Sequence, residues 1–505
     1  MSNETPTKGI AKVIFSSSLG TLIEWYDFYI FGMLAKTISV QFFPEGNDTA
    51  ALLSTLAIFA AGFLVRPFGA LVFGRLGDMI GRKSTFLLTL VLMGGSTFLI
   101  GLVPSYKAIG IAAPLLVLLL RLIQGLALGG EYGGAATYVA EHAPAHRRGY
   151  FTAWIQTTAT LGLFVALGVI MAVKSNMSDA AFNSEWGGWR YPFWISILLV
   201  GVSIYIRLKM SESPLYAALK KEGKTSVNPL KESFGHKNNF KMVLLALFGA
   251  VMGQGVIWYT GQFYAQSFLE NTCKLEFMQS RSILLWAIAL ATPFFLFFGW
   301  LSDKIGRKWI MLVGMLLGII FYRPIFGNFL EKSSYKNWSE IDLWRYKKTA
   351  DTLNLTTIVV NDSTTSSSCT IVTTRGSYEL VTNKNIRTLS EKKEVKNITL
   401  PLITKWEFIF LIWIMIVFVT MVYGPIAAFL VELFPTKIRY TSMSLPYHIG
   451  NGVFGGLVPF IATLLSTTFT NDPLVGLWYP IGVAALCFVI GALYLNNKVD
   501  KDIND

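Results

Sequence analysis

The stretch Gly74-Arg-Leu-Gly-Asp-Met-Ile-Gly-Arg-Lys83 returns later in the chain as Gly299-Trp-Leu-Ser-Asp-Lys-Ile-Gly-Arg-Lys308, with seven of ten positions identical. A second set of residues follows each copy at one constant offset. Its members are Tyr132, Gly133, Glu141, Pro144 and Arg148 in the first half, and Tyr423, Gly424, Glu432, Pro435 and Arg439 in the second. Chance matching does not easily produce both sets, so the sequence predicts a chain built from two related halves.

Long apolar segments surround both copies of the motif. The 505 residues are 53% hydrophobic and 14% charged, whereas a soluble domain carries about 25% charge. A helix crosses a bilayer with about 20 apolar residues, while the strands of a membrane barrel are only about 10 residues long and alternate in polarity. The sequence therefore predicts an all-α membrane protein with twelve transmembrane helices in two six-helix, pseudo-symmetric halves. The predicted spans are 11–37, 50–74, 84–103, 110–139, 150–173, 191–209, 240–268, 281–299, 309–330, 406–432, 441–466 and 477–496.

The spacing of the repeated residues locates an insertion. Asp78 and Glu141 are 63 residues apart but Asp303 and Glu432 are 129 apart, so 66 extra residues lie between the ninth and tenth spans. This segment, 331–405, is polar and contains Thr- and Val-rich stretches typical of strands. We expect a small, β-rich cap on the extracytoplasmic side, with a disordered loop as the alternative. The other predicted domains are an N-terminal six-helix bundle (1–209), a cytoplasmic linker (210–239) and a C-terminal six-helix bundle (240–505).

The formal charge of +13 has two interpretations. A basic surface can bind nucleic acid, but here the lysines and arginines fall in alternate short loops, the pattern that keeps those loops in the cytoplasm. We therefore expect no nucleic-acid partner, both termini in the cytoplasm, and a location in the plasma membrane, which is the inner membrane in a bacterium. Only three cysteines occur, so no metal site is expected. A disulfide between Cys273 and Cys369, both extracytoplasmic, is left open.

Three short motifs carry a family resemblance. The paired loop motif, with Arg121-Leu-Ile-Gln124-Gly125 in the fourth span, resembles the major facilitator superfamily. Glu24-Trp-Tyr-Asp27-Phe-Tyr29 and Gly129-Gly-Glu131-Tyr-Gly-Gly134 are similar to its metabolite:proton symporter family, whose members carry shikimate, alpha-ketoglutarate, citrate, and proline or betaine. The resemblance covers nearly the whole chain except 331–405. It implies the major facilitator fold and proton-coupled symport of a small organic solute, a carboxylate or a zwitterion, by alternating access.

Enzymatic motifs do not accompany these features. The sequence contains no H-E-x-x-H, no Walker loop and no G-x-S-x-G elbow. We therefore expect a monomeric transporter rather than an enzyme, with the lipid bilayer as its surroundings, a proton as the coupling ion and no other cofactor. Two alternatives stay open: a passive facilitator of the same fold, and a membrane sensor that binds a ligand through the insertion and transports nothing.

Ionisable residues within the spans are candidates for function, because each costs about 2.5 to 3.5 kcal/mol at mid-membrane. Glu24 and Asp27 share one face of the first helix, and Arg121 and Glu131 lie in the fourth. Carboxylates partly removed from water can bind and release protons near neutral pH. We expect these four residues to form the proton-coupling group, in which Asp27 carries the proton and Arg121 either modulates it or holds solute. A structural ion pair is the alternative.

Polar and aromatic residues of the spans are candidate solute contacts, although membrane aromatic residues also serve as interface anchors. The candidates are Tyr26, Tyr29, Gln124, Gln156, Gln254, Trp258, Tyr259, Gln262 and Tyr264. Arg66, which precedes Pro67 toward the cytoplasmic half, is a weaker functional candidate, with the anchoring of loops as its alternative role. Gly125, Gly129 and Gly133 recur every fourth residue, a small-residue stripe that predicts close helix packing.

The repeated loop motifs predict a gate at the cytoplasmic ends of the two halves. Asp78 can face a helix N-terminus or pair with Arg82, and Asp303 and Arg307 repeat this arrangement. The family resemblance adds four further gating residues, which are Glu141, Arg148, Glu432 and Arg439.

Overall fold

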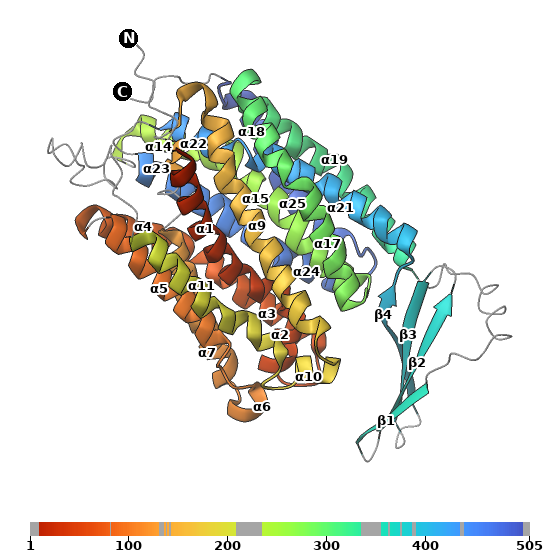
Figure 1. The fold of residues 1–505 in the computed structure, drawn as a ribbon. Helices are drawn as coiled ribbons and strands as arrows, with labels where there is room; N and C mark the ends of the chain where they lie inside the picture. The colour runs from red at the N-terminus through yellow and green to blue at the C-terminus, as the bar shows by residue number, and fades with distance from the viewer. Residues whose placement is uncertain are drawn as a thin grey trace, which may run out of the picture.

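A computed structural model of the chain shows two bundles of long helices side by side, with a small sheet beyond one end of them (Figure 1). It describes residues 10–80, 82–130, 136–137, 139–140, 143–208, 235–334, 355–361, 364–373, 376–385, 390–434 and 439–497.

The first half is built from helices that match the first six predicted spans. A break of one residue divides each of two spans, so that α1 is followed by α2 and α3 by α4. The helices are α1 (Ile10–Met33), α2 (Ala35–Phe42), α3 (Asp48–Leu64), α4 (Arg66–Ile80), α5 (Arg82–Ile100), α7 (Ala112–Gly129), α9 (Arg148–Ser175) and α11 (Tyr191–Leu208), with short α6 (Tyr106–Ile109) and α10 (Asp179–Asn183) in the connections.

The second half repeats this plan with more irregular helices. Its elements are α14 (Lys237–Ala246), α15 (Met252–Tyr259), α16 (Ala265–Ser267), α17 (Phe277–Ala291), α18 (Pro293–Ile305), α19 (Lys308–Ser333), α21 (Leu402–Tyr423), α22 (Ile426–Leu433), α23 (Arg439–Tyr447), α24 (Val458–Thr468) and α25 (Trp478–Tyr494). The span Lys237–Thr272 is continuous and contains α14, α15 and α16.

The twelve predicted spans are confirmed. Among the described residues, nine helical segments are long and apolar enough to cross a bilayer, and α1, α5 and α11 occupy the other three predicted positions. Backbone polar groups must find partners inside the chain when lipid surrounds them, which favours helices. Hydroxyl groups within the spans follow the same rule: Thr97 donates to the carbonyl of Met93, and Thr260 to that of Val256.

Two spans of the second half contain π-helical turns, which often mark functional sites. In the seventh span these turns are Leu247–Val251, Thr260–Tyr264 and Phe268–Thr272, and in the eleventh the turn is His448–Gly455. The two irregular spans pack tightly, because a Cβ added to Gly255 would lie 2.5 Å from the carbonyl oxygen of Gly450. The glycines at 450 and 452 therefore serve helix packing within a membrane span.

The predicted glycine stripe brings α7 against α3 and α4. A Cβ on Gly125 would collide with the carbonyl of Gly62, and a Cβ on Gly129 would collide with that of Arg66. Packing of this kind, in which backbone meets backbone, is typical of small-residue stripes in lipid. The packing prediction is confirmed for both glycines, while Gly133 lies outside the described residues.

This packing predicts that Gly125→Ala destabilises the protein. Because the added methyl group would meet backbone, the helices must separate, and such overpacking costs about 1 to 3 kcal/mol. We expect a lower unfolding temperature in detergent and less monodisperse protein. Gly95→Ala is the control, since no atom lies within 4 Å of a Cβ there. Equal unfolding temperatures for the two variants would refute the packing interpretation.

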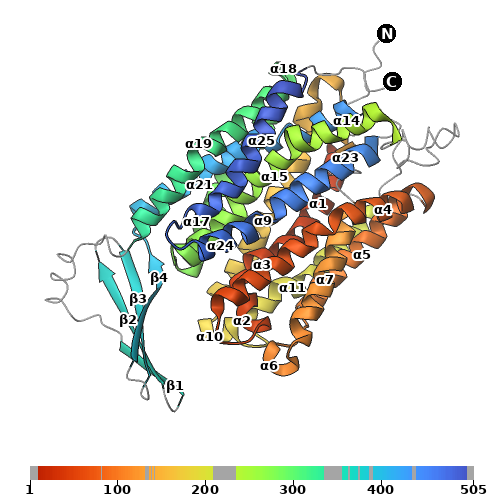
Figure 2. The ribbon, with the colours of Figure 1, turned by 180° about the vertical axis from the view of Figure 1, so that it is seen from behind.

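The insertion forms the expected β-rich cap. Strands β1 (Leu355–Asn361), β2 (Thr364–Thr373), β3 (Gly376–Asn385) and β4 (Ser390–Thr399) pair antiparallel in the order β1-β2-β3-β4. Figure 2, seen from behind, shows the sheet at the end of the bundle opposite to α14 and α23. The sheet and the α18–α19 loop motif therefore lie at opposite ends, as the predicted topology requires.

The disulfide left open by the sequence involves Cys273 and Cys369. The Cys273 thiol is free and the residue is 3% exposed, while the side chain of Cys369 lies outside the described ones. Burial raises the pKa of the Cys273 thiol to about 12, which keeps it in its unreactive, protonated form.

Candidate functional site

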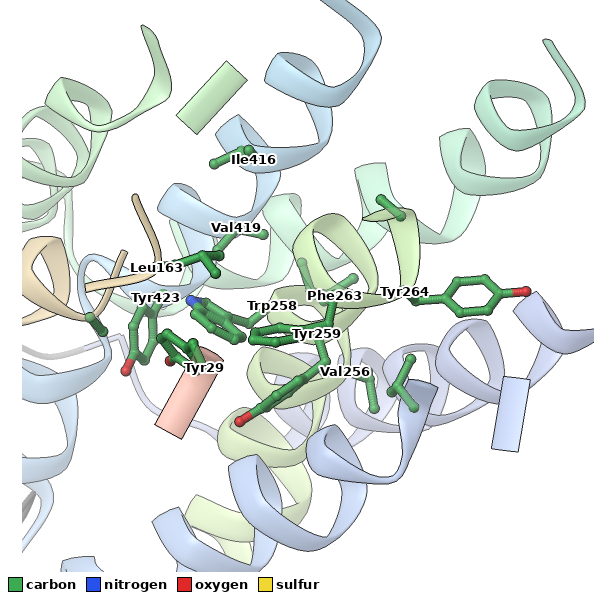
Figure 3. Close-up of a cluster of buried hydrophobic side chains, with 14 of the residues drawn as sticks. Tyr29, Leu163, Val256, Trp258, Tyr259, Phe263, Tyr264, Ile416, Val419 and Tyr423 are labelled. Atoms are coloured by element: carbon green, nitrogen blue, oxygen red, sulfur yellow. The ribbon is translucent and has the colours of Figure 1, made fainter. Parts of the chain in front are cut away.

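An aromatic cluster joins the first and seventh spans at the centre of the molecule. Tyr29 of α1 stacks on Trp258 of α15 with ring centroids 5.4 Å apart, and it lies 5.0 Å from Phe263. Trp25 also stacks on Tyr29, at 5.0 Å, and its ring lies 6.3 Å from that of Trp258. Figure 3 shows Tyr29, Trp258, Tyr259 and Phe263 in one group. The predicted solute contacts of the two halves thus meet in one buried cluster.

Arg66 lies at the edge of this cluster. Its guanidinium carbon is 4.1 Å from the ring centre of Phe63 and 4.3 Å from that of Phe28, and the residue is 1% exposed. The Tyr259 side chain lies next to it. Within the described part of the chain, Nε and Nη2 of Arg66 have no hydrogen-bond partner. The alternative role of Arg66, the anchoring of loops, is therefore wrong, because its side chain points into the core between the halves.

Arg121 supplies a second buried guanidinium. Its carbon lies 4.1 Å from the Phe28 ring centre, so both arginines contact the same aromatic ring. Nη1 donates to the carbonyl of Phe28 at 3.4 Å and to Oε1 of Gln124, whereas Nε and Nη2 have no partner among the described residues. No described carboxylate forms an ion pair with Arg66 or Arg121. Two guanidinium groups therefore lie in the core without an ion-pair partner among the described residues.

Gln124 connects α7 to two neighbouring helices. Its Nε2 donates to the main-chain carbonyl of Asp27 at 3.0 Å and to Oγ1 of Thr97 at 2.8 Å. Since its Oε1 accepts from Arg121, the whole amide is engaged within the first half. Gln124, a predicted solute contact, therefore links Arg121 to the backbone of α1 through its hydrogen bonds.

Asp27 is a buried carboxylate, 1% exposed, on the side of α1 that faces α5 and α11. A Cβ on Gly94 of α5 would lie 3.3 Å from its Oδ2, and Ser196 of α11 is its polar neighbour. Neither carboxylate oxygen accepts a hydrogen bond from a described residue. The structure does not join Asp27 and Arg121 in the ion pair that was the alternative for these residues. Glu24, one turn earlier, is 2% exposed, and Glu131 lies outside the described residues.

The remaining predicted solute contacts divide into two groups. Tyr26 donates to the carbonyl of Pro192 at 2.8 Å and so holds α1 against α11. Gln262, in contrast, is fully buried and its amide has no hydrogen-bond partner among the described residues, and the same holds for the Tyr29 hydroxyl. Gln156 on α9 is also fully buried. Tyr29 and Gln262 are thus available to a ligand, whereas Tyr26 is engaged structurally.

A polar chain in the second half was not foreseen from the sequence. Gln254 lies 3.5 Å from Oδ1 of Asn451, whose Nδ2 donates to the Tyr447 hydroxyl at 3.0 Å. That hydroxyl lies 2.8 Å from the Tyr423 hydroxyl. Figure 3 shows Tyr423 beside Tyr29 and Trp258, so the chain ends at the aromatic cluster. The signal for it was the cluster of polar residues in the π-helical part of the eleventh span.

Four predicted gating residues meet at the end of the bundle opposite to the sheet. Asp303 accepts from the backbone N–H groups of Gly149 and Tyr150, at 2.7 and 2.8 Å, at the start of α9. Arg307 pairs with Asp303 at 2.7 Å and with Glu432 at 2.9 Å. Arg148 pairs with Glu432 at 3.2 Å. This network ties α9 of the first half to α18 and α22 of the second.

Burial alone would lower the pKa of Arg307, but the carboxylates of Glu432 and Asp303 outweigh it and hold the pKa above its usual range. The Arg307 guanidinium therefore stays charged. Arg439 is placed elsewhere, where its Nε donates to the carbonyl of Phe434. Glu141 and the side chains of Asp78 and Arg82 lie outside the described residues.

Comparisons with known proteins give one consistent picture. A family profile described as "Sugar (and other) transporter" matches residues 13–241. The chain is 31% identical to an inner membrane metabolite transport protein of Escherichia coli K12, over 92% of this chain and 90% of the relative. It is 30% identical to the alpha-ketoglutarate permease of the same organism, over 96% of this chain and 93% of the permease. A proline/betaine transporter of that organism is 33% identical over 63% of this chain and 64% of its own length.

Solved structures share the fold at low sequence identity. The xylose transporter of Escherichia coli, in a partially occluded inward open conformation, superimposes with a TM-score of 0.63 at 16% identity, over 97% of this chain and 98% of the other. A D-xylose-proton symporter gives a TM-score of 0.62, also at 16% identity, over 98% of this chain and 99% of the symporter chain.

Proposed function

This chain belongs to the major facilitator superfamily, among transporters of metabolites, and from this membership we propose that it carries a small carboxylate-bearing solute together with a proton. As a member it is an integral membrane transporter of small solutes. The proposal adds two points to this membership, which are the chemical class of the solute and the proton as coupling ion.

The observation that carries the proposal is the pair of buried arginines, Arg66 and Arg121, for which the described part of the chain supplies no ion-pair partner. A buried charge without a partner is costly, and a guanidinium suits a carboxylate because its planar N–H groups donate to both oxygens. Nε and Nη2 of Arg66 and Arg121 have no partner among the described residues, so they are free to donate to a ligand. A solute carboxylate at this point would accept hydrogen bonds from these guanidinium groups and offset one of their two positive charges.

The aromatic cluster adds a second feature of the solute. Trp25, Tyr29 and Trp258 offer ring faces, which attract ammonium groups. Alpha-ketoglutarate, proline and betaine, named for two of the relatives, all carry a carboxylate, and the last two also carry a positive nitrogen. The arginines therefore define the shared chemistry, and the rings allow a zwitterion as well as an anion.

Asp27 is the proposed proton carrier. Removing an unpaired carboxylate from water is expensive, so this position favours the neutral acid when the site is closed. The carbonyl of Asp27 accepts from Gln124, which also binds Arg121. Solute binding at Arg121 would therefore shift the Gln124 side chain, whose hydrogen bond holds α1 at Asp27. This connection gives a physical route by which occupation of one site alters proton binding at the other.

Alternating access requires that the network at Asp303, Arg307, Glu432 and Arg148 closes and opens. Two similar bundles can rock about a site between them, and this network joins the bundles at one end. In this conformation it holds that end closed, because all four side chains are paired.

We expect Glu432→Gln to open that end. Loss of one partner in a buried ion pair costs about 3 to 5 kcal/mol, so a cysteine placed at Thr152, which is fully buried in α9, should react with an impermeant maleimide about tenfold faster or more. Glu407→Gln is the control, because Glu407 pairs with Lys332 at the other end of the bundle. Equal labelling rates in all three backgrounds would contradict a latch role.

The proposal is tested by uptake into proteoliposomes. Labelled alpha-ketoglutarate, citrate, shikimate, proline, betaine and xylose are offered with and without an inward proton gradient. We expect at least one carboxylate-bearing compound to accumulate above its external concentration only with the gradient, and xylose not to enter. Accumulation of xylose alone would overturn the solute class. If the solute only equilibrates across the membrane, and does so equally with and without the proton gradient, the protein is a passive facilitator.

A further inference from the structure

The start of α17 contacts the first half at the end of the bundle that carries the sheet. Phe277, the first residue of α17, packs on Phe182 of α10 with ring centroids 5.6 Å apart. Arg281, one turn later, is fully buried, and its Nη2 donates to the main-chain carbonyl of Met33, the last residue of α1. The guanidinium of Arg281 also lies over the Phe277 ring. These contacts join the two halves at the end opposite to the network of gating residues.

Glu270 of the seventh span holds the Arg281 side chain in place. Nη1 of Arg281 pairs with Glu270 at 3.2 Å, and 1% and 7% of the two side chains are exposed. A buried ion pair keeps its geometry because separation would leave each charge without a partner away from water. The pair therefore directs the other N–H groups of Arg281 toward α1. We call Glu270, Arg281 and the carbonyl of Met33 the sheet-end latch.

Little space remains beside the sheet-end latch. Glu270 lines a void of about 20 Å³ together with Leu56, Phe59 and Phe263. A volume of this size holds about one water molecule. The rings of Phe59 and Phe263 lie 5.5 Å apart, and Phe263 lies 5.0 Å from Tyr29 of the aromatic cluster. In this conformation the path from the sheet end to the cluster is therefore closed to a solute.

The inserted sheet binds the same turns of α17. Both ends of the Gln279 side-chain amide bond to the backbone of Leu400: Nε2 donates to its carbonyl, and its N–H donates to Oε1, each at 2.7 Å. The backbone N–H of Glu276 donates to the carbonyl of Ile398 at 2.8 Å, and the N–H of Ile398 donates to the carbonyl of Lys274 at 2.9 Å. The end of β4 is thus fastened to the residues with which α17 begins.

Apolar packing reinforces this attachment. Tyr378, Val395 and Ile398 of the sheet are buried, and they belong to the same cluster of apolar side chains as the bundle core. Leu275, which precedes α17, lies in that cluster too. Removal of apolar surface from water is the main favourable term in such packing. The sheet therefore moves together with the start of α17.

We propose that the inserted sheet stabilises the closed state of the gate at the sheet end, because it fixes the turns of α17 that carry Phe277 and Arg281 into contact with the first half. Gln279 and Arg281 are two residues apart, so the sheet contact and the latch contact lie within one helical turn. Gln279 is a positioning residue, since it acts on the sheet-end latch through α17. The inference rests on the proposed function only for alternating access, and it is independent of the solute and of the proton.

The test measures the accessibility of a cysteine placed at Leu56, which lines the void and is 3% exposed. We expect Gln279→Ala to speed maleimide labelling of the purified protein about threefold or more, because two hydrogen bonds to the sheet are lost. The double variant Glu270→Gln/Arg281→Gln removes the sheet-end latch without leaving an unpaired charge, and it should speed labelling about tenfold or more. Each rate is corrected for labelling of the protein without the added cysteine.

The control substitution is Asn328→Ala. The amide of Asn328 donates to Glu407 at 3.3 Å, so its hydrogen bond joins α19 to α21 rather than the sheet to α17. A cysteine at Thr152, at the opposite end of the bundle, separates gate opening from a looser fold. Alternating access predicts that labelling there slows when the sheet end opens, whereas a loosened fold labels faster at both positions.

The outcomes separate this inference from the proposed function. Labelling at Leu56 that is unchanged by Gln279→Ala, or equal to that of Asn328→Ala, overturns the role of the sheet. A rise at both cysteines overturns it as well, because the substitution then loosens the whole fold. In either case gradient-driven uptake by the wild type still upholds the proposed function. Failure of the wild type to take up any solute, with the expected labelling pattern intact, overturns the proposed function and supports the gate.

Discussion

Asp27→Asn is expected to abolish accumulation of solute against a gradient while leaving solute exchange at equal concentrations intact. Asparagine has the shape of the protonated acid but cannot release a proton, so the variant would cycle with its solute and never use the proton gradient. One charge moving through 100 mV is worth about 2.3 kcal/mol, or roughly fiftyfold accumulation, and this is the quantity the variant should lose.

The measurement is labelled uptake into proteoliposomes with and without an inward proton gradient, together with counterflow at equal pH. Glu45→Gln is the matched carboxylate-to-amide control, since Glu45 is exposed in a loop, where it pairs with Lys107 at 2.7 Å. Gradient-driven accumulation that survives in Asp27→Asn would move the proton site to another residue. Glu24, buried one turn earlier on α1, would then be the next to replace.

Arg66→Lys is expected to lower kcat/KM for carboxylate uptake by at least about thirtyfold. Lysine keeps the charge, but it cannot lie flat on Phe28 and Phe63 or donate to both oxygens of a carboxylate. Truncating a buried, hydrogen-bonded charge pair costs about 2 to 5 kcal/mol, which corresponds to this loss or more. We expect the folded protein to remain, because the substitution preserves charge and aliphatic length.

The control for this variant is Arg323→Lys. Arg323 forms a half-exposed ion pair with Asp472 at 3.0 Å and is remote from the aromatic cluster. Uptake and unfolding temperature are measured for both variants, so that a loss of fold is distinguished from a loss of solute binding. Uptake by Arg66→Lys at the wild-type rate would show that Arg66 serves packing alone.

The overall architecture was accessible from the sequence because its signals are local. Apolar runs define spans, the ten-residue motif repeats with its spacing intact, and the extra residues between the ninth and tenth spans carry a strand pattern. The position of Asp303 at a helix N-terminus was also foreseen, although the helix it faces, α9, belongs to the other half.

The arrangement of the site was less accessible, because it depends on how each helix is rotated about its axis. Tyr29 and Trp258, each named as a candidate solute contact, prove to face each other, whereas Tyr26 and Gln124 hold helices together. Asp27 and Arg121 lie on neighbouring helices and still face different surroundings.

Arg66 was misjudged for a related reason. Its position before Pro67 at a helix break suggested a place near the loops, whereas the break between α3 and α4 directs its side chain into the core. The free-energy cost of placing an arginine within a membrane span was the signal that favoured a position in the core between the halves. The docking of the sheet beside the seventh span could not be read from the sequence at all, because it depends on backbone hydrogen bonds between segments far apart in the chain.

The central claim is that each solute molecule enters with a proton, and the most direct test follows the proton itself. Proteoliposomes that contain a pH-sensitive dye, at equal pH inside and outside, receive whichever carboxylate the uptake panel shows to be carried. The account predicts that the interior becomes more acidic as the solute enters, and that Asp27→Asn removes this change. Solute entry at the wild-type rate with no change in internal pH would contradict proton symport.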